Sequence, residues 1–443
     1  MKYAIVTFGC RVNQADSLAI ERQLQGVGGC AVPLEQAELV VVNTCSVTAT
    51  ADKGARQIIR RVARSNPAAR IVATGCYATR AAADLATLPG VAAVIANDDK
   101  ERFVNRLRDE LGPTTAERFG AGDGACGAVD PPGTAGRTSY TLRVQTGCDE
   151  TCAYCIIPST RGRGRSVPLM GVLAEVDRAA AAGFQEFTIT GVHLGSYGRD
   201  LAPNLSLLDL LRALETYPAP MLFRLSSLEP MDCTPAIVDL VAAGLRFAPH
   251  FHLPLQHGSD RVLRAMRRPY TVDYYRRLVM SIRARLPNAA IGSDLVVGFP
   301  GETAEDAEAT VSFLRASPLT YLHVFPYSDR PGTDATQLSG KVPRPEIRER
   351  GRAVRAAGAD LSARFRASQV GTIRSALTLK NDEGMLAVTD NYLKVHLAAG
   401  HPGNRRVLVR VRGGGERVTG EVVPEAAVAG QRASALQARA IGL

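Results

Sequence analysis

Short apolar strands alternate with amphipathic helical segments along most of this chain, and that alternation restricts the fold more than any other feature. In the first hundred residues, strand-like runs occur at 3–8, 39–42, 71–73 and 91–95. Helical periodicity lies between them, near 15–25 and 51–64. This order predicts a parallel sheet with helices on its faces.

A second alternating series follows, and its strand-like runs are 141–145, 186–190, 222–226, 250–253, 291–296 and 321–325. Amphipathic segments such as 170–182 and 274–286 separate these runs. Six strand–helix units are too few for a closed barrel of eight, so we expect a partial barrel. From about Ser368 the helical period gives way to short β-like runs at 373–379, 385–388, 393–397, 407–411 and 418–423, which predict a small β-barrel.

These patterns predict an α/β protein of several domains, as expected for 443 residues. The predicted boundaries give an N-terminal sheet domain over 1–111, a linker over 112–137, a partial (β/α)6 barrel over 138–367 and a small β-barrel over 368–443. The linker is assigned because it is rich in Gly, Pro, Thr and Ala and has little apolar content.

The composition is that of a globular chain, with 46% hydrophobic and 22% charged residues. No run approaches the roughly 18 apolar residues of a membrane span, and the N-terminus reads as a buried strand rather than a signal peptide. We therefore expect a cytoplasmic protein with no membrane partner. The nine cysteines should then be reduced, which favours metal binding or catalysis over disulfides.

The net charge of +10 is unevenly distributed along the chain. One helical stripe consists of Lys53, Arg56, Arg60 and Arg64. A second basic stretch consists of Arg344, Arg348, Arg350, Arg352, Arg355, Arg364 and Arg366. Positive stripes attract phosphate backbones, so they indicate a polyanionic partner. Solvated helix faces are the alternative explanation.

Three cysteines stand close together just after a predicted strand. Cys148, Cys152 and Cys155 have CxxxCxxC spacing, which allows them to ligate three irons of a four-iron cluster. The fourth iron then lacks a protein ligand and is open to a chelating substrate. Zinc is the alternative, and it would need a fourth ligand such as His193.

A second set of cysteines is dispersed in the sequence. Cys10, Cys45 and Cys76 each follow the end of a predicted strand in the N-terminal sheet. Ligands bind at the carboxyl edge of such sheets, and neighbouring strands lie about 4.8 Å apart, so the three thiols can converge on a second cluster. The alternative is three buried cysteines that act as small apolar residues. The other three cysteines have no partner at ligand spacing and are interpreted as incidental: Cys30, Cys126 and Cys233.

With both triads in place, the chain resembles the methylthiotransferases of the radical S-adenosylmethionine superfamily, including the aromatic Tyr154 before the last cysteine of the first triad. The sequences TFGCRVNQ at 7–14, NTCSVT at 43–48 and TDNYLKV at 389–395 resemble the branch that acts on N6-threonylcarbamoyladenosine in tRNA. The Ile-Arg-Glu sequence that usually follows the second cysteine in the isopentenyladenosine branch is absent. Ala15 and Thr146 depart from the common pattern of the family.

The resemblance implies two [4Fe–4S] clusters, with S-adenosylmethionine bound to the open iron of the Cys148, Cys152 and Cys155 cluster and cleaved there to a 5′-deoxyadenosyl radical. It also implies that the Cys10, Cys45 and Cys76 cluster carries sulfur, which a further S-adenosylmethionine methylates. The product would be 2-methylthio-N6-threonylcarbamoyladenosine at adenosine 37 of tRNA. A TRAM-like C-terminal barrel would bind the tRNA. A flavodoxin- or ferredoxin-type electron donor and a sulfur donor would serve the enzyme, for which a monomer is the default expectation.

Residues at the ends of the predicted barrel strands are candidates for cradling S-adenosylmethionine, because barrel enzymes do their chemistry there. They are Thr190, Gly191, Ser226, Glu229, Gln256 and Asp294. For each of them, a turn or cap role is the alternative. Lys394 is a candidate phosphate or anticodon-loop contact, and the sequence YSDRPGT at 327–333 matches a family motif without a physical assignment.

Two other functions compete with this interpretation. A methylthiotransferase of the same family could act on another modified adenosine or on a ribosomal protein. A non-catalytic RNA-binding protein with structural metal sites would explain the basic stripes and the C-terminal barrel, but it would not explain two triads that each lack a fourth ligand.

Overall fold

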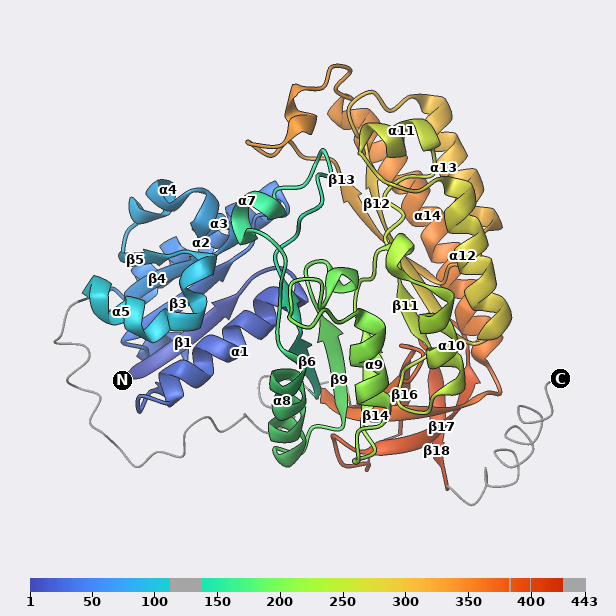
Figure 1. The fold of residues 1–443 in the computed structure, drawn as a ribbon, viewed down its shortest axis with the longest axis horizontal. Helices are drawn as coiled ribbons and strands as arrows, with labels where there is room; N and C mark the ends of the chain where they lie inside the picture. Colours follow the sequence, from blue (N-terminus) through green and yellow to red (C-terminus); the bar gives the residue numbers. More distant parts are fainter. Residues whose placement is uncertain (112–137, 382–383, 399, 425–443) are drawn as a thin grey trace.

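The computed structural model describes residues 1–111, 138–381, 384–398 and 400–424 and confirms the predicted α/β class (Figure 1). The predicted linker and Cys126 lie outside the described residues. In the described part of the chain, no helix is long and apolar enough to cross a membrane.

The N-terminal body is a parallel sheet of five strands in the order β2-β1-β3-β4-β5. Its strands are β1 (Lys2–Thr7), β2 (Cys30–Ala31), β3 (Leu39–Thr44), β4 (Arg70–Gly75) and β5 (Val91–Ile95). Its helices are α1 (Arg11–Gln25), α2 (Ala49–Ser65), α3 (Cys76–Arg80), α4 (Ala82–Ala86) and α5 (Phe103–Leu111).

Strand β3 shows why this sheet is covered on both faces. Its residues 39–44 are all buried. Val40 and Val42 pack with the α2 residues Ala55, Ile59 and Val62, whereas Leu39 and Val41 pack with apolar residues of α1 and α5. Successive side chains of a strand point to opposite faces, so an unbroken apolar run requires a helix layer on each side.

The central body contains six parallel strands in chain order, as the partial barrel requires. Three strands form the sheet β6-β9-β10 and three form β11-β12-β13, with a parallel bridge between Ser227 and His252 at the junction. The strands are β6 (Ser139–Arg143), β9 (Glu186–Thr190), β10 (Leu222–Leu225), β11 (His250–His252), β12 (Ala290–Val297) and β13 (Tyr321–Pro326).

Helices cover the outside of these strands (Figure 1). They are α8 (Leu169–Ala181), α9 (Leu207–Glu215), α10 (Pro235–Ala243), α11 (Asp260–Ala265), α12 (Val272–Arg285), α13 (Ala304–Ala316) and α14 (Arg344–Gln369). The predicted strand 141–145 is wrong as a single element. The chain leaves the sheet after Arg143, and β7 (Gln145–Thr146) pairs antiparallel with β8 (Arg165–Ser166), which brackets the cysteine loop and α7 (Ile157–Arg161).

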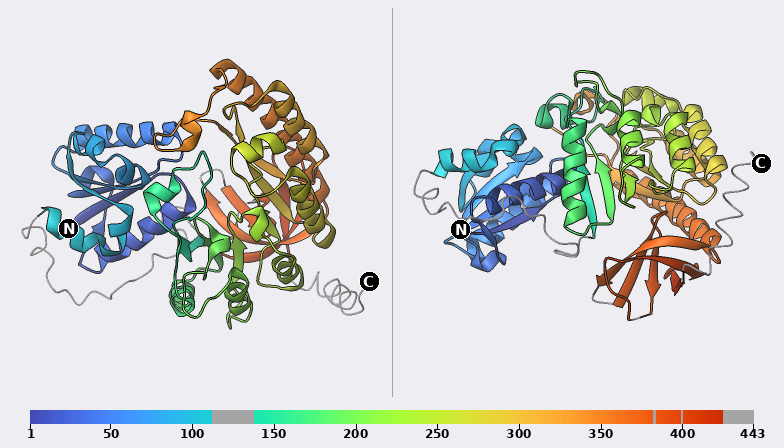
Figure 2. Two further views of the ribbon diagram at one scale, coloured as in Figure 1. Left: turned by 45° about the horizontal axis from the view of Figure 1, so that its top comes forward. Right: turned by 60° about the horizontal axis from the view of Figure 1, so that its bottom comes forward.

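The C-terminal body is a closed barrel in the order β14-β15-β16-β18-β17 (Figure 2). Its strands are β14 (Ile373–Asn381), β15 (Gly384–Thr389), β16 (Lys394–Leu397), β17 (Arg406–Gly413) and β18 (Thr419–Val423). Arg224 of β10 fixes this barrel to the central body. Its buried guanidinium pairs with Glu186 at 3.2 Å and donates to the backbone carbonyls of Thr389 and Asp390.

Candidate active site

The CxxxCxxC loop is held in a tight fold between β7 and α7. Gly147 has φ +75°, and a Cβ atom there would lie 1.9 Å from the carbonyl oxygen of Arg163, so only glycine fits. The backbone N–H of Cys148 donates to the carbonyl of Gly162 at 3.1 Å. Arg268 donates to the sulfur of Cys152 at 3.0 Å. The loop therefore presents its three thiols on a short, fixed turn.

Burial favours the protonated form of two thiols of this loop, Cys152 and Cys155. It raises the pKa of Cys155 to about 12 and also raises the pKa of Cys152, which Arg268 partly offsets. Metal ligation requires thiolates, so assembly of a cluster here must release protons. The charge of Arg268 is placed to stabilise the thiolate that results.

The second triad lies at the carboxyl ends of three adjacent strands. Cys10 follows β1, Cys45 follows β3 and Cys76 begins α3 directly after β4, and these strands are neighbours in the order β1-β3-β4. Burial raises the pKa of Cys45 to about 11, and the charges of Cys10 and Cys76 add to this rise. The three cysteines thus follow neighbouring strand ends, and their convergence on one cluster stays a prediction.

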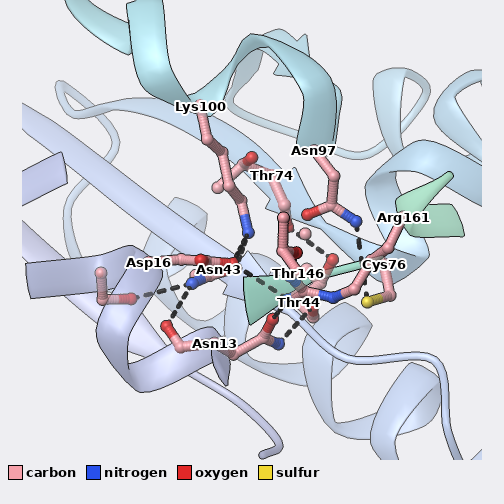
Figure 3. Close-up of polar contacts among 12 residues, drawn as sticks. Asn13, Asp16, Asn43, Thr44, Thr74, Cys76, Asn97, Lys100, Thr146 and Arg161 are labelled. Carbon is pink, nitrogen blue, oxygen red and sulfur yellow. Dashed lines mark hydrogen bonds and ion pairs between the residues drawn. The ribbon is translucent and has the colours of Figure 1, made fainter. Parts of the chain in front are cut away.

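Two glycines let the backbone approach closely at this second triad. A Cβ atom on Gly9, at φ +93°, would lie 2.6 Å from the Cys45 sulfur. A Cβ atom on Gly75, at φ +99°, would lie 2.1 Å from the carbonyl oxygen of Thr44. Any larger residue would push the cysteine-bearing turns apart. Asn97 donates to the Cys76 sulfur at 3.7 Å (Figure 3).

Sulfur–sulfur spacing distinguishes a single zinc ion from a four-iron cluster. Zinc lies about 2.3 Å from each sulfur in a tetrahedral site, so its thiolates lie about 3.8 Å apart. Within the described part of the chain, three possible ligand atoms lie within 4.8 Å of one another only at His252, Asp294 and His323. Neither triad has all three sulfur atoms within that distance of one another. In a four-iron cubane each thiolate binds a different iron, which allows wider spacing.

A cavity of about 710 Å³ lies between the N-terminal sheet and the partial barrel. Cys10 and Cys45 line it from the N-terminal side. All six residues predicted to cradle S-adenosylmethionine also line it: Thr190, Gly191, Ser226, Glu229, Gln256 and Asp294. Cys148, Cys152 and Cys155 line a separate hollow of about 450 Å³ instead. Cys76 lines neither of the two.

Two polar residues connect the cavity with the CxxxCxxC loop. Glu229 forms an ion pair with Arg268, the residue that donates to Cys152; burial raises the pKa of Glu229, and Arg268 opposes the rise. Nε2 of His193 donates to the Asp232 carboxylate at 2.8 Å. Burial disfavours its charged form, but hydrogen bonding to Asp232 and Cys148 raises the pKa of His193 to about 10. His193 is thus held by a carboxylate at the edge of the cysteine loop.

An aromatic and histidine-rich wall lines the cavity, and the sequence analysis did not identify it. Its members are His250, His252, Tyr321, His323, Phe325 and Tyr392. Neighbouring rings among them have centroids 4.8–6.5 Å apart. Period-two spacing in the sequences HFH at 250–252 and YLHVF at 321–325 is the signal that could have revealed this wall, because alternate residues of a strand share a face.

Asp294 lies between two histidines of this wall. Its carboxylate is 3.1 Å from His252 and 3.3 Å from His323. Burial by itself raises the pKa of Asp294, but the interactions with the two adjacent histidines outweigh it and lower that pKa to about 2. Hydrogen bonding to Asp294 raises the pKa of His323 in return. The cavity lining therefore carries a negative charge at the Asp294 carboxylate.

The remaining predicted residues lie elsewhere. Cys233 is buried in the core, where burial raises its pKa to about 12, and Cys30 is exposed on the edge strand β2. Lys394 is exposed on β16. The motif at 327–333 gains a structural role, because its buried Arg330 pairs with Asp52 of α2 at 2.8 Å and so joins the barrel to the N-terminal body.

Comparison with known proteins agrees with the two-part site. Residues 2–96 match the uncharacterized protein family UPF0004, and residues 142–314 match the Radical SAM superfamily. The radical S-adenosylmethionine methyltransferase TsrM of Kitasatospora setae shares the fold, with a TM-score of 0.54 at 18% identity over 73% of this chain and 72% of that one.

Curated relatives match over most of their length. The threonylcarbamoyladenosine tRNA methylthiotransferase MtaB of Bacillus subtilis (strain 168) is 33% identical, covering 92% of this chain and 96% of the relative. The protein of the same name from Aquifex aeolicus (strain VF5) is 36% identical, covering 89% and 96%. Proteins named tRNA-2-methylthio-N(6)-dimethylallyladenosine synthase and ribosomal protein uS12 methylthiotransferase RimO match at 35% and 32% identity. Together with the two cysteine triads, these matches place the chain in the radical S-adenosylmethionine methylthiotransferase family.

Proposed function

We propose that this enzyme is a tRNA methylthiotransferase that acts at C2 of N6-threonylcarbamoyladenosine at position 37. The observation that carries the proposal is the shared cavity, which sets Cys10 and Cys45 opposite the six candidate S-adenosylmethionine contacts. A base bound there would have the sulfur-carrying cluster on one side and the radical source on the other. Sequence relatives named for this reaction support the choice of substrate.

The C2–H of an adenine is neither acidic nor electrophilic, so acid–base groups alone cannot replace it. The [4Fe–4S] cluster and S-adenosylmethionine of this family supply a 5′-deoxyadenosyl radical for that purpose. Cys148, Cys152 and Cys155 would hold this cluster. Glu229, kept in place by Arg268, and the free backbone around Gly191 would orient the cofactor toward the cavity.

We further propose that Cys10, Cys45 and Cys76 hold a second [4Fe–4S] cluster that carries the sulfur. Gly9 leaves room beside the Cys45 sulfur because it lacks a side chain, and Gly75 does the same beside the Thr44 backbone. Each triad supplies three thiolates, which leaves one iron open for sulfur or for a chelating cofactor. A reducing donor of the flavodoxin or ferredoxin type and a sulfur donor complete the reaction.

The aromatic wall supports a nucleic-acid substrate. Purines stack on aromatic and histidine side chains, and such stacking contributes about 1–3 kcal/mol per base. Tyr392 brings the C-terminal barrel to the same wall, with its ring 4.8 Å from that of His250 and 5.2 Å from the Arg224 guanidinium. A tRNA bound by this barrel could therefore place one flipped base directly in the cavity.

The proposal is tested by mass spectrometry of nucleosides after incubation of the anaerobically reconstituted enzyme with S-adenosylmethionine and a reductant. Three substrates are compared: tRNA bearing N6-threonylcarbamoyladenosine, tRNA bearing N6-isopentenyladenosine, and ribosomal protein uS12. The proposal predicts methylthiolation of the first. Modification of only the isopentenyl tRNA or only the ribosomal protein would assign the enzyme to another branch of its family. Absence of any product, with iron present, would favour a non-catalytic RNA-binding role.

A further inference from the structure

Arg11 occupies a distinctive place in the cavity. It is the first residue of α1 and directly follows Cys10, and it lines the main cavity together with Cys10 and Cys45. Its guanidinium donates to the hydroxyl of Thr188 at 3.0 Å and to the hydroxyl of Tyr392 at 3.3 Å. Arg11 therefore stands where the N-terminal sheet, the partial barrel and the C-terminal barrel meet.

The other charged groups that line this cavity are paired. Arg161 is bound by Asp16, and Glu229 by Arg268. Asp294 is bound by His252 and His323, and His193 by Asp232. Each of these groups therefore already has an ionisable partner within the protein.

Arg11 differs from them. Among the described residues, no carboxylate lies within ion-pair distance of its guanidinium, and both of its partners are neutral hydroxyls. Glu186, which lines an adjoining hollow with Arg11, is already paired with Arg224. A guanidinium carries five N–H donors, so several remain to receive an anionic group inside the cavity.

We propose that Arg11 binds the carboxylate of the threonyl group on the substrate base and thereby selects N6-threonylcarbamoyladenosine. This inference rests on the proposed function. The reacting C2 and the C6 that carries the N6 substituent flank the same ring nitrogen, N1, so a group that reads the substituent lies near the sulfur-transfer site. Arg11 meets that condition because it adjoins Cys10. The planar fork of arginine also suits two-point binding of a carboxylate.

Two other anions could use the same cation: the carboxylate of S-adenosylmethionine and a phosphate of the tRNA backbone. The candidate contacts of the cofactor lie on the barrel side, near Glu229 and His193, which border the CxxxCxxC loop. The phosphate backbone is more readily met by exposed cations such as Arg60 of α2. The threonyl carboxylate is therefore the source that fits best.

The test compares wild-type enzyme with Arg11→Gln, Arg11→Lys and the control Arg60→Gln. The substrates are an anticodon stem-loop RNA bearing N6-threonylcarbamoyladenosine and the same RNA with the threonyl carboxylate blocked as its methyl ester. Binding is measured by fluorescence anisotropy, and methylthiolation by mass spectrometry. Loss of a charge-assisted hydrogen bond corresponds to a loss of about ten- to a hundredfold.

The wild-type enzyme should bind the free acid about ten- to a hundredfold more tightly than the ester, whereas Arg11→Gln should bind both equally weakly. Arg11→Lys should recover part of the preference, because it keeps the charge but loses the fork. Arg60→Gln should weaken the binding of both RNAs by the same factor.

An undiminished preference for the free acid in Arg11→Gln would overturn the inference while leaving the proposed function intact. Weakening of both RNAs by the same factor, with the preference for the free acid kept, would indicate a phosphate contact and would also overturn the inference. A raised KM for S-adenosylmethionine without loss of that preference would indicate a cofactor contact and would overturn it too. Failure of the wild-type enzyme to modify the acid-bearing RNA would instead defeat the proposed function.

Discussion

Replacing Asp16 with Asn should weaken the joint between the N-terminal body and the partial barrel more than any exposed ion pair there. The Asp16 carboxylate is fully buried and pairs with Lys100 at 2.8 Å and Arg161 at 2.9 Å (Figure 3). It also pairs with Arg143 at 2.9 Å. Burial alone raises the pKa of Asp16, but the three cations outweigh it and hold that pKa well below its usual value. The carboxylate is therefore ionised and neutralises charges from both bodies.

The magnitude follows from the burial of the cations. The side chains of Lys100 and Arg161 are only 5% and 3% exposed. Removing one partner of a buried pair leaves an uncompensated charge and costs about 3–5 kcal/mol. The matched control is Asp98→Asn, because Asp98 and Arg165 also pair across the two bodies, at 3.0 Å, but are largely exposed. An exposed pair contributes about 0–1 kcal/mol.

The assay is urea unfolding of the reconstituted enzyme under anaerobic conditions, followed by far-ultraviolet circular dichroism. The chain contains no tryptophan, so indole fluorescence offers no signal. With an m-value of about 3 kcal/mol/M, Asp16→Asn should lower the midpoint by about 1–2 M. The control should lower it by about 0.3 M or less. Equal shifts in the two variants would refute the role assigned to the Asp16 network.

Four further outcomes are expected. The pKa of Asp16 is depressed in the folded state, so its stabilisation is fully present above its unfolded pKa of about 3.9 and is lost as the pH falls further. The stability difference between wild type and Asp16→Asn should therefore shrink below about pH 4 in acid titrations. Gly75→Ala, which forces a Cβ to 2.1 Å from the Thr44 carbonyl, should lower the iron content from about eight to about four atoms per chain by chemical assay. Glu229→Gln should keep both clusters but slow 5′-deoxyadenosine formation about tenfold, as measured by chromatography. Tyr392→Ala should weaken tRNA binding about tenfold in filter-binding assays without loss of iron, because it removes one stacking surface.

Much of this architecture follows from local sequence patterns. The apolar runs on both faces of β3 predict a helix-covered parallel sheet, and β9 was predicted with its observed ends, Glu186–Thr190. The short strands β2 and β8 were missed, because two residues carry no periodicity. Closure of the C-terminal strands into a barrel was also predictable, because short β-like runs separated by turns need to protect their edges.

The site was predictable only where ligand chemistry leaves a spacing in the sequence. Cys148, Cys152 and Cys155 stand on one loop, and the strand ends at Cys10, Cys45 and Cys76 can be read from apolar runs. The roles of Asp16 and Arg330 could not be predicted, because their partners lie 84 or more residues away along the chain, in other elements. Such contacts arise from packing between domains, which no local pattern records.

The most direct test of the central claim uses a variant with Cys10, Cys45 and Cys76 all replaced by Ala. If these cysteines hold only the sulfur-bearing cluster, the variant should retain about four irons and still cleave S-adenosylmethionine to 5′-deoxyadenosine. It should form no 2-methylthio nucleoside on tRNA bearing N6-threonylcarbamoyladenosine, whereas the wild-type enzyme forms both products. Both are measured by mass spectrometry in one reaction. Full methylthiolation by the triple variant would contradict the two-cluster account.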